Sequence, residues 1–246
     1  MTRLMLILRF DGRGYHGWQV QKNAQSVQQT LQDAVEQVTG VRSGIIGCSR
    51  TDSGVHADMF CCTTDTNSKL RGEAMVTALN ANLPRDIAVY ECREMPQDFH
   101  PRYSALGKRY IYRIWNDKAR NPFQEGLAIH IRRPLDVELL NTAAQDYIGT
   151  HDFTSFCSAG SSVQDTLRTV TRCEVTREGL MVTFLVKADG FLYNMVRIMV
   201  GTMLEISAGK REYNSIPDII GAKARSAAGM TAPACGLMLD KVFYDY

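Results

Sequence analysis

The order of strand-like and helix-like segments limits most strongly how this 246-residue chain can fold. Leu4–Phe10 has the pattern of a strand, and Val27–Val38 has helical spacing of its apolar residues. Similar segments follow along the chain, but they do not repeat in the regular strand–helix–strand rhythm of a doubly wound parallel sheet. The sequence therefore predicts an α+β fold.

Local signals place the individual elements. Ser26 is a typical helix cap, and Gln29 stands three residues later, as in a capping box. Gly40 is typical of the residue just after a helix. In the segment Lys108–Trp115, Tyr110 lies on one face of a predicted strand. Other predicted elements are Ala74–Leu83, Pro134–Tyr147, Val170–Val175, Leu180–Val186, Asn194–Ile206 and Asp240–Tyr246.

Composition excludes several classes of protein. Apolar residues make up 45% and charged residues 22%, which is ordinary for a globular chain and unlike collagen, a coiled coil or a disordered protein. The most apolar stretch after the first residues, Phe191–Ile206, includes Arg197 and is too short to cross a bilayer. Seven cysteines without a CxxC pair argue against a zinc site and fit a reducing compartment. We therefore expect a cytoplasmic protein without membrane segments.

The region 96–106 is the expected crossing between two halves of the chain. It contains two prolines, little periodicity and many polar groups. We predict an N-terminal α+β half at 1–103, which carries the loop around Asp52. A C-terminal α+β half at 104–246 carries Tyr110 and Arg197.

Residues 100–133 are much more basic than the chain as a whole. Eight Lys and Arg residues face two acidic ones there, whereas the whole chain has a net charge of only +2. Tyr103, Tyr110, Tyr112 and Trp115 are interleaved with them. Cations beside flat aromatic rings are typical of surfaces that bind phosphates and stack unpaired bases. The alternative is an ordinary solvated strand face beside a core face.

The segment 47–57, GCSRTDSGVHA, is the best candidate for a catalytic loop. Asp52 lies between hydroxyl residues, Gly54 follows two positions later, and Arg50 precedes by two. Glycine lets another molecule approach the backbone closely. The alternative is an ordinary turn in which Asp52 caps a backbone group.

This loop, RTDSGVHA, resembles the signature loop of the tRNA pseudouridine synthases that modify positions 38–40 of the anticodon arm, of the bacterial type A. The resemblance extends over essentially the full length, through further blocks in the expected order. These blocks are FDGRGYHGWQVQ at 10–21, GKRYIYRIW at 107–115, GTHDFTSF at 149–156, GFLYNMVRIMVG at 190–201 and APACGLMLDKV at 232–242.

The resemblance implies an isomerase that converts uridine to pseudouridine in the anticodon stem-loop of tRNA, at positions 38, 39 and/or 40. It implies two α+β halves that share an extended, mostly antiparallel sheet with a central active-site cleft. It also implies a homodimer that binds tRNA. The reaction needs neither redox change nor energy input, so we expect no cofactor and no metal. The absence of a GxxxxGK[ST] loop and of a zinc pattern agrees with this.

By the same correspondence, Asp52 is the catalytic nucleophile. It attacks C1′ or C6, or it removes a sugar proton to give a glycal. Arg197 matches the arginine that faces this carboxylate. An arginine in so apolar a helix needs an anion, since an unpaired buried charge is costly. Pairing with Asp52 would favour the ionised carboxylate. The alternative is that Arg197 extends to solvent.

Tyr110 and Arg50 are the other two residues that the resemblance assigns to substrate binding. Tyr110 matches the tyrosine that packs on the target base, and its hydroxyl is a candidate for proton transfer at C5. Arg50 resembles the arginine that helps to hold the target nucleotide out of the stack. The alternatives are a core tyrosine and a surface guanidinium. Tyr15, His16 and Trp18 either stack on RNA or pack the first strand.

Three positions depart from the family's usual residues. Ser49 stands where Gly is common, Ser53 where Ala is frequent and Ile198 where Asn is frequent. These side chains are small or distant from the reacting atoms, so we expect activity to survive, with room for a changed target preference. His56, His151 and Asp152 lack metal-ligand spacing.

Two alternative functions remain. One is a catalytically inactive RNA-binding or tRNA-folding protein of the same fold. Retention of Asp52, Arg50, Tyr110 and Arg197 together argues against it. The other is an unrelated hydrolase, which would need a metal or a second carboxylate near the loop.

Overall fold

The computed structural model describes residues 1–160 and 163–245, and it divides them into two compact units. The first unit comprises Met1–Leu106 with the C-terminal residues from Met238 onward, and the second comprises Gly107–Leu237. Each unit combines a sheet with helices, which confirms the predicted α+β class. The C-terminal segment, assigned from sequence to the second half, adds a strand to the first unit. Tyr246, the last residue of that predicted strand, lies outside the described residues.

The sheet of the first unit has the strand order β4-β1-β3-β10, with β2 paired to β3. β1 is antiparallel to both of its neighbours, whereas β10 runs parallel to β3. Leu4–Leu8 of β1 are at most 2% exposed, as expected of a central strand. The bounds are β1 Thr2–Phe10, β2 Ile45–Gly47, β3 His56–Thr66, β4 Ile87–Met95 and β10 Leu237–Phe243.

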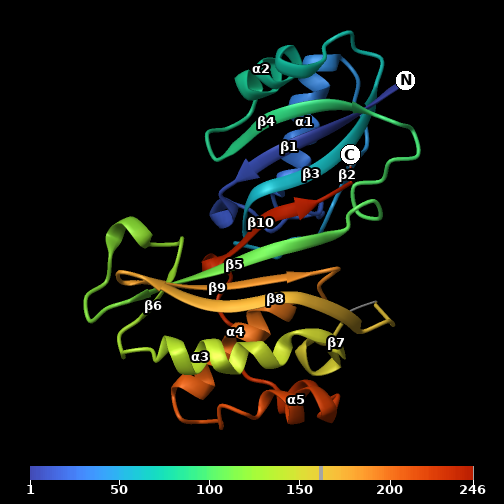
Figure 1. The fold of residues 1–246 in the computed structure, drawn as a ribbon. Helices are drawn as coiled ribbons and strands as arrows, with labels where there is room; N and C mark the ends of the chain where they lie inside the picture. The colour runs from blue at the N-terminus through green and yellow to red at the C-terminus, as the bar shows by residue number, and fades with distance from the viewer. Residues whose placement is uncertain (161–162, 246) are drawn as a thin grey trace. The chain divides into compact units, whose positions relative to one another are not determined.

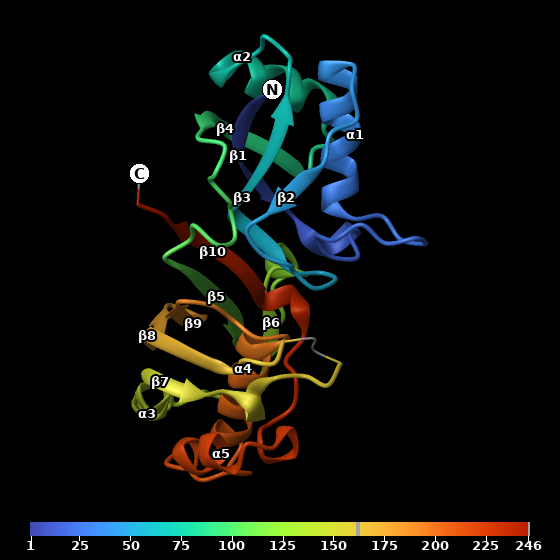
Figure 2. The ribbon, with the colours of Figure 1, turned by 90° about the vertical axis from the view of Figure 1, so that its right-hand side faces the viewer.

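Two helices, α1 (Val27–Thr39) and α2 (Gly72–Asn82), accompany this sheet (Figure 2). The predicted caps of α1 are confirmed. Ser26 Oγ accepts a hydrogen bond from the Gln29 N–H at 3.2 Å, and Gly40 ends the helix in the left-handed conformation with φ 74°. The buried face of α1 consists of Val27, Gln28, Leu31, Ala34 and Val35.

The sheet of the second unit has the order β5-β9-β8-β7, all antiparallel, with β6 parallel to β5. On β5 the residues alternate between buried and half-buried, so the strand face that carries Tyr110 is the core face, and Tyr112 lies on the same face. The bounds are β5 Gly107–Asn116, β6 Ile129–Ile131, β7 Gly149–Asp152, β8 Leu167–Glu178 and β9 Met181–Ala188.

Helices α3 (Val137–Ala144), α4 (Met195–Ser207) and α5 (Ile216–Ala222) lie below this sheet in the view of Figure 1. α4 is buried along nearly its whole length, which explains its apolar sequence. Among the described residues, no helix has the length and apolar character that crossing a membrane requires. Single 3-10 turns occur at Gly12–Gly14, Pro122–Gln124, Gln145–Tyr147, Thr154–Phe156, Arg225–Ala227 and Ala234–Gly236.

Candidate active site

The predicted catalytic loop connects β2 to β3 in the first unit. Asp52 is half-buried at its turn, and its carbonyl oxygen accepts a hydrogen bond from the Val55 N–H at 3.2 Å. Gly54 adopts φ 79°, a left-handed conformation that glycine tolerates best. Arg50 is exposed two residues earlier. The loop thus presents a carboxylate and a guanidinium from one tight turn.

The N-terminal segment around Gly17 holds this loop through main-chain contacts. The Trp18 N–H donates to the Thr51 carbonyl oxygen at 3.2 Å, and the Gly54 N–H donates to the Tyr15 carbonyl oxygen at 3.3 Å. Gly17 has φ 83°, and a Cβ atom there would lie 2.3 Å from the Thr51 carbonyl oxygen. Backbone therefore packs directly on backbone, which only glycine permits at this position.

Gly12 makes a second close approach to the same loop. A Cβ atom on Gly12 would lie 2.0 Å from the Val55 carbonyl oxygen. The Gly12 N–H donates to Nδ1 of His56 at 3.1 Å, and Asp11 Oδ1 lies 3.2 Å from the same nitrogen. His56, whose place in the sequence lacks metal-ligand spacing, thus ties the end of β1 to the start of β3.

Trp18 and Tyr15, which the sequence left as candidates for either RNA stacking or core packing, pack within the first unit. Trp18 is 2% exposed and stacks on Phe60 with ring centroids 4.1 Å apart. Tyr15 is 4% exposed, and its hydroxyl donates to Asp86 at 2.7 Å. Burial and this neighbouring carboxylate raise the pKa of Tyr15. These two rings therefore support the scaffold of the Asp52 loop, whereas His16 is exposed.

Tyr110 lies on the buried face of β5 in the second unit. It is 6% exposed and contacts Phe191 edge to face, with ring centroids 4.9 Å apart and an interplanar angle of 80°. This contact fixes the ring against the segment that leads into α4. Tyr112, two residues further, is fully buried and donates its hydroxyl to the Pro233 carbonyl oxygen at 2.8 Å. Tyr112 is therefore a core residue.

Arg197 lies in the first turn of α4, where two acceptors hold its guanidinium. Nε donates to the Ala232 carbonyl oxygen at 2.8 Å, and Nη1 donates to Asn194 Oδ1 at 2.7 Å. The backbone bond from Ala232 N–H to the Arg197 carbonyl oxygen, 3.0 Å long, ties the same two residues together. The side chain is half-buried and directed by these acceptors. Its pairing with Asp52 stays a prediction.

The basic stretch 100–133 does not form one uniform surface. Arg102 and the 77% exposed Tyr103 belong to the first unit, whereas Lys108 is a buried residue of β5. Within this stretch, the exposed cations of the second unit lie after β5, at Lys118, Arg120 and Arg132. The expected mixture of stacking rings and cations is therefore divided by the alternation of β5 and by the boundary between the units.

The groups that hold the Arg197 guanidinium were not predicted from the sequence. Asn194 adopts the left-handed conformation with φ 61°, which Asn tolerates better than most residues, and this places its side chain beside the guanidinium. The second acceptor, the Ala232 carbonyl, belongs to the backbone and leaves no mark in the residue types. Asparagine directly before an apolar helical run was the only available signal.

The chemistry available at these residues is that of a carboxylate, guanidinium groups and a phenol. Within the described ranges 1–160 and 163–245, no group of three or more His, Cys, Asp or Glu side chains is arranged to hold a metal ion. Asp52 and Arg50 belong to the first unit, and Tyr110 and Arg197 belong to the second.

Comparison with known proteins gives a consistent result over the whole chain. The sequence profile of the family described as tRNA pseudouridine synthase matches residues 6–104 and 143–245. Proteins named tRNA pseudouridine synthase A from Acetivibrio thermocellus and from Thermoanaerobacter sp. strain X514 are 46% and 44% identical over 244 residues. These matches cover 99% of this chain and 100% of each relative.

Among solved structures, a chain in the crystal structure of a Cbf5-Nop10-Gar1 complex matches 96% of this chain and 57% of its own length. The TM-score is 0.34 and the sequence identity 12%, so this likeness adds nothing to the assignment. The family assignment rests instead on the profile match and on the full-length sequence identities. The chain belongs to the tRNA pseudouridine synthase family.

Proposed function

We propose that this chain converts uridine to pseudouridine in the anticodon arm of tRNA, at positions 38, 39 and/or 40. Conversion of uridine to pseudouridine in tRNA is the activity after which its family and full-length relatives are named. The family match over both units is the observation that carries the proposal. The position in the anticodon arm rests on the resemblance of the RTDSGVHA loop and the blocks around it.

Asp52 is the proposed nucleophile. The reaction breaks the N1–C1′ bond of uridine, turns the uracil and forms a C5–C1′ bond. C5 loses its proton to solvent, and N1 gains one, so the product is an isomer of the substrate. A carboxylate on a rigid loop suits such a step because it needs little reorganisation. The backbone contacts of the loop with Gly12 and Gly17 support this role.

The other three residues take the roles that the resemblance suggests. Tyr110 packs on the target base, and its hydroxyl assists proton transfer at C5. Arg197 pairs with the Asp52 carboxylate and favours its ionised form. Arg50 helps to hold the swung-out nucleotide, which must leave the stack before its glycosidic bond is reached. The exposure of Arg50 and the fixed guanidinium of Arg197 support these assignments.

We also propose a cofactor-free homodimer that acts in the cytoplasm. The isomerisation changes neither the oxidation state nor the composition of the substrate, so the amino-acid side chains suffice for it. The seven cysteines are free thiols, as a reducing compartment favours. A dimer would join two modest basic surfaces into one longer tRNA groove.

Tritium release from tRNA transcripts labelled at uridine C5 tests this proposal directly. Each turnover replaces the C5–H bond, so one tritium appears in water for each pseudouridine. Transcripts in which only one of the positions 38, 39 and 40 is uridine identify the target. The proposed position would be contradicted by tritium release from a tRNA transcript that keeps all its uridines together with no release from any of the three single-position transcripts.

The Asp52→Asn variant tests the nucleophile. The amide retains the shape of the carboxylate, so we expect tRNA binding within about twofold of the parent. Pseudouridine formation should fall by at least about 10⁴-fold, as for removal of a catalytic nucleophile. Residual turnover near the parent rate would refute the role of Asp52. Absence of tritium release from the parent enzyme itself would favour the inactive RNA-binding alternative.

A further inference from the structure

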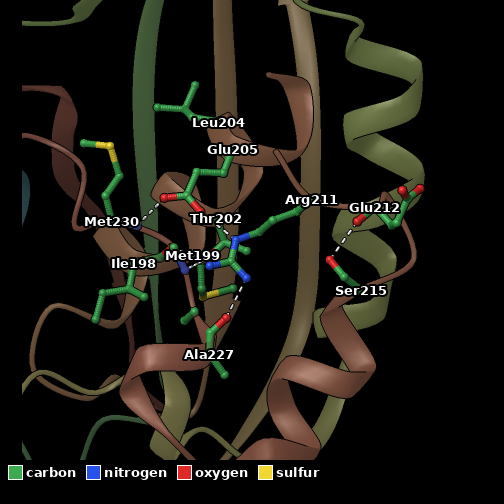
Figure 3. Close-up of polar contacts among 12 residues, drawn as sticks. Ile198, Met199, Thr202, Leu204, Glu205, Arg211, Glu212, Ser215, Ala227 and Met230 are labelled. Carbon is green, nitrogen blue, oxygen red and sulfur yellow. Dashed lines mark hydrogen bonds and ion pairs between the residues drawn. The ribbon is translucent and has the colours of Figure 1, made fainter. Parts of the chain in front are cut away.

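We propose that the ion pair between Glu205 and Arg211 is a positioning device for Arg197. This inference rests on the proposed role of Arg197 in catalysis. Glu205 lies near the C-terminal end of α4, two turns after Arg197, and Arg211 follows the helix. Figure 3 shows the pair between α4 and the segment 227–230. We call Ala227–Ala232 the strap, because it runs along α4 and ends at the acceptor of the Arg197 guanidinium.

The pair holds the strap at two backbone groups. Arg211 Nε lies 2.6 Å from Glu205 Oε2, and Arg211 Nη1 donates to the Ala227 carbonyl oxygen at 2.6 Å. The other carboxylate oxygen of Glu205 accepts from the Met230 N–H at 2.9 Å. Arg211 and Glu205 thus each bind one backbone group of the strap, and these two groups lie three residues apart in the chain (Figure 3).

The strap lies against α4 at backbone distance. A Cβ atom on Gly201 would stand 1.7 Å from the Met230 carbonyl oxygen, and one on Gly229 would stand 2.6 Å from Thr202 Cα. The Gly229 N–H also donates to Thr202 Oγ1 at 2.9 Å. At so close a contact, the strap cannot slide along α4 without losing these bonds together.

The far end of the strap is the acceptor of Arg197. Ala232 is fully buried, its carbonyl oxygen binds Arg197 Nε at 2.8 Å, and its N–H returns to the Arg197 carbonyl oxygen. A shift of the strap by one ångström would therefore move or release the guanidinium. Positional errors of that size reduce catalytic rates by about a hundredfold.

The electrostatics of Glu205 fit a clamp rather than a solvated surface residue. The two side chains are only 21% and 25% exposed. Partial burial opposes the charge of Glu205, but hydrogen bonds from Arg211 and from the Met230 N–H lower its pKa below the ordinary value. The carboxylate is therefore ionised and engaged on both oxygens at neutral pH.

Glu205→Ala is the direct test, with Glu174→Ala as matched control. Glu174 forms an ion pair of similar length, 2.7 Å, with Arg172 on β8 of the same unit. In single-turnover tritium release with tRNA transcripts, we expect Glu205→Ala to be slower by about tenfold to a hundredfold. The Kd for tRNA should stay within about twofold of the parent. The control should match the parent in both.

A double-mutant cycle separates positioning from general stability. If Glu205 acts through Arg197, Glu205→Ala should slow an Arg197→Lys enzyme by less than about twofold, because the guanidinium is already gone. Additive losses, or a change in the Kd for tRNA in place of the rate, would overturn the proposal. So would equal rates for Glu205→Ala and Glu174→Ala.

Two further variants keep the test decisive if Glu205→Ala does not fold. Glu205→Gln retains an oxygen for the Met230 N–H but loses the charge that pairs with Arg211, so its rate should lie between those of Glu205→Ala and the parent. The exchange E205R/R211E keeps opposite charges but places each beside the wrong backbone group, so it should not recover the rate. Recovery of the parent rate by the E205R/R211E exchange would overturn the proposal. A parent enzyme without tritium release would instead refute the proposed function.

Discussion

The two units support their candidate residues by different means. In the first unit, backbone holds backbone: Gly12 and Gly17 let the N-terminal segment lie directly against the Asp52 loop. In the second unit, hydrogen bonds hold a side chain: Arg197 donates to Asn194 and to the Ala232 carbonyl of the strap, and Glu205 and Arg211 hold the strap in turn. The first support is steric and insensitive to charge, whereas the second depends on ionised groups.

This difference matches what each residue is proposed to do. A nucleophile must keep its distance from one reacting atom, and a tight main-chain turn provides that with few rotatable bonds. An arginine has a long and flexible side chain, so its guanidinium needs several acceptors to hold one orientation. Substitutions that add volume should therefore damage the first unit most. Substitutions that remove charge should affect the second.

Gly17→Ala should give the largest effect. The new Cβ meets the Thr51 carbonyl oxygen at 2.3 Å, and φ 83° is unfavourable for alanine. We expect a loss of about 3 kcal/mol in the free energy of unfolding and a roughly hundredfold slower turnover. Denaturant unfolding and tritium release measure the two effects.

Two glycine controls divide this effect into its causes. Gly40→Ala has a similar φ, 74°, but open space around its Cβ, so it measures the cost of backbone strain alone. Gly14→Ala, with its nearest contact at 3.8 Å, should be almost neutral. If Gly17→Ala destabilises the protein and slows turnover no more than Gly40→Ala does, the close contact at Gly17 is not what holds the Asp52 loop in place.

Gly201→Ala asks whether the second unit also needs a close backbone contact. Its Cβ would meet the Met230 carbonyl oxygen at 1.7 Å and push the strap away from α4. We expect about 2 kcal/mol of destabilisation and a slower turnover, because the Ala232 acceptor moves with the strap. Gly221→Ala, in α5 with open space at its Cβ, is the control. Unchanged turnover would mean that the position of the strap does not matter to Arg197.

Much of the local structure could be predicted because its causes are local. Ser26 and Gly40 mark the ends of α1 by their own backbone chemistry, and the alternation of β5 places Tyr110 on its buried face. The helix predicted at Pro134–Tyr147 was too long at its start. Asp136 caps α3 by accepting a hydrogen bond from the Leu139 N–H, so Pro134 lies before the helix.

Features that depend on distant contacts could not be predicted in this way. β10 joins β3 through the pairs Met238–His56 and Leu239–Ala57, and nothing in its own sequence indicates that partner. Asp52, Tyr110 and Arg197 occupy the predicted loop, strand and helix, but their roles came from the family resemblance. Nothing in the sequence marks Glu205 as a structural residue, since its partners lie 6 and 25 positions later in the chain.

Tyr110→Phe probes the ring separately from its hydroxyl. Phenylalanine retains the edge-to-face contact with Phe191, so folding and tRNA binding should change little. If the hydroxyl assists proton transfer at C5, turnover should fall by at least about tenfold. Tritium release and tRNA binding, measured on the same preparation, distinguish the two contributions. A loss smaller than that would leave only base stacking to Tyr110.

The charge dependence of the second unit should appear in the pH dependence of stability. The pKa of Glu205 is lowered in the folded protein, so its contribution is present above the ordinary value of 4.5 and is lost as pH falls through the lowered one. Glutamine does not titrate. The free energy of unfolding of the parent, measured in urea, should therefore exceed that of Glu205→Gln by about 1 kcal/mol near pH 6. This difference should shrink toward pH 3. A difference that is independent of pH would mean that the carboxylate contributes by its shape and not by its charge.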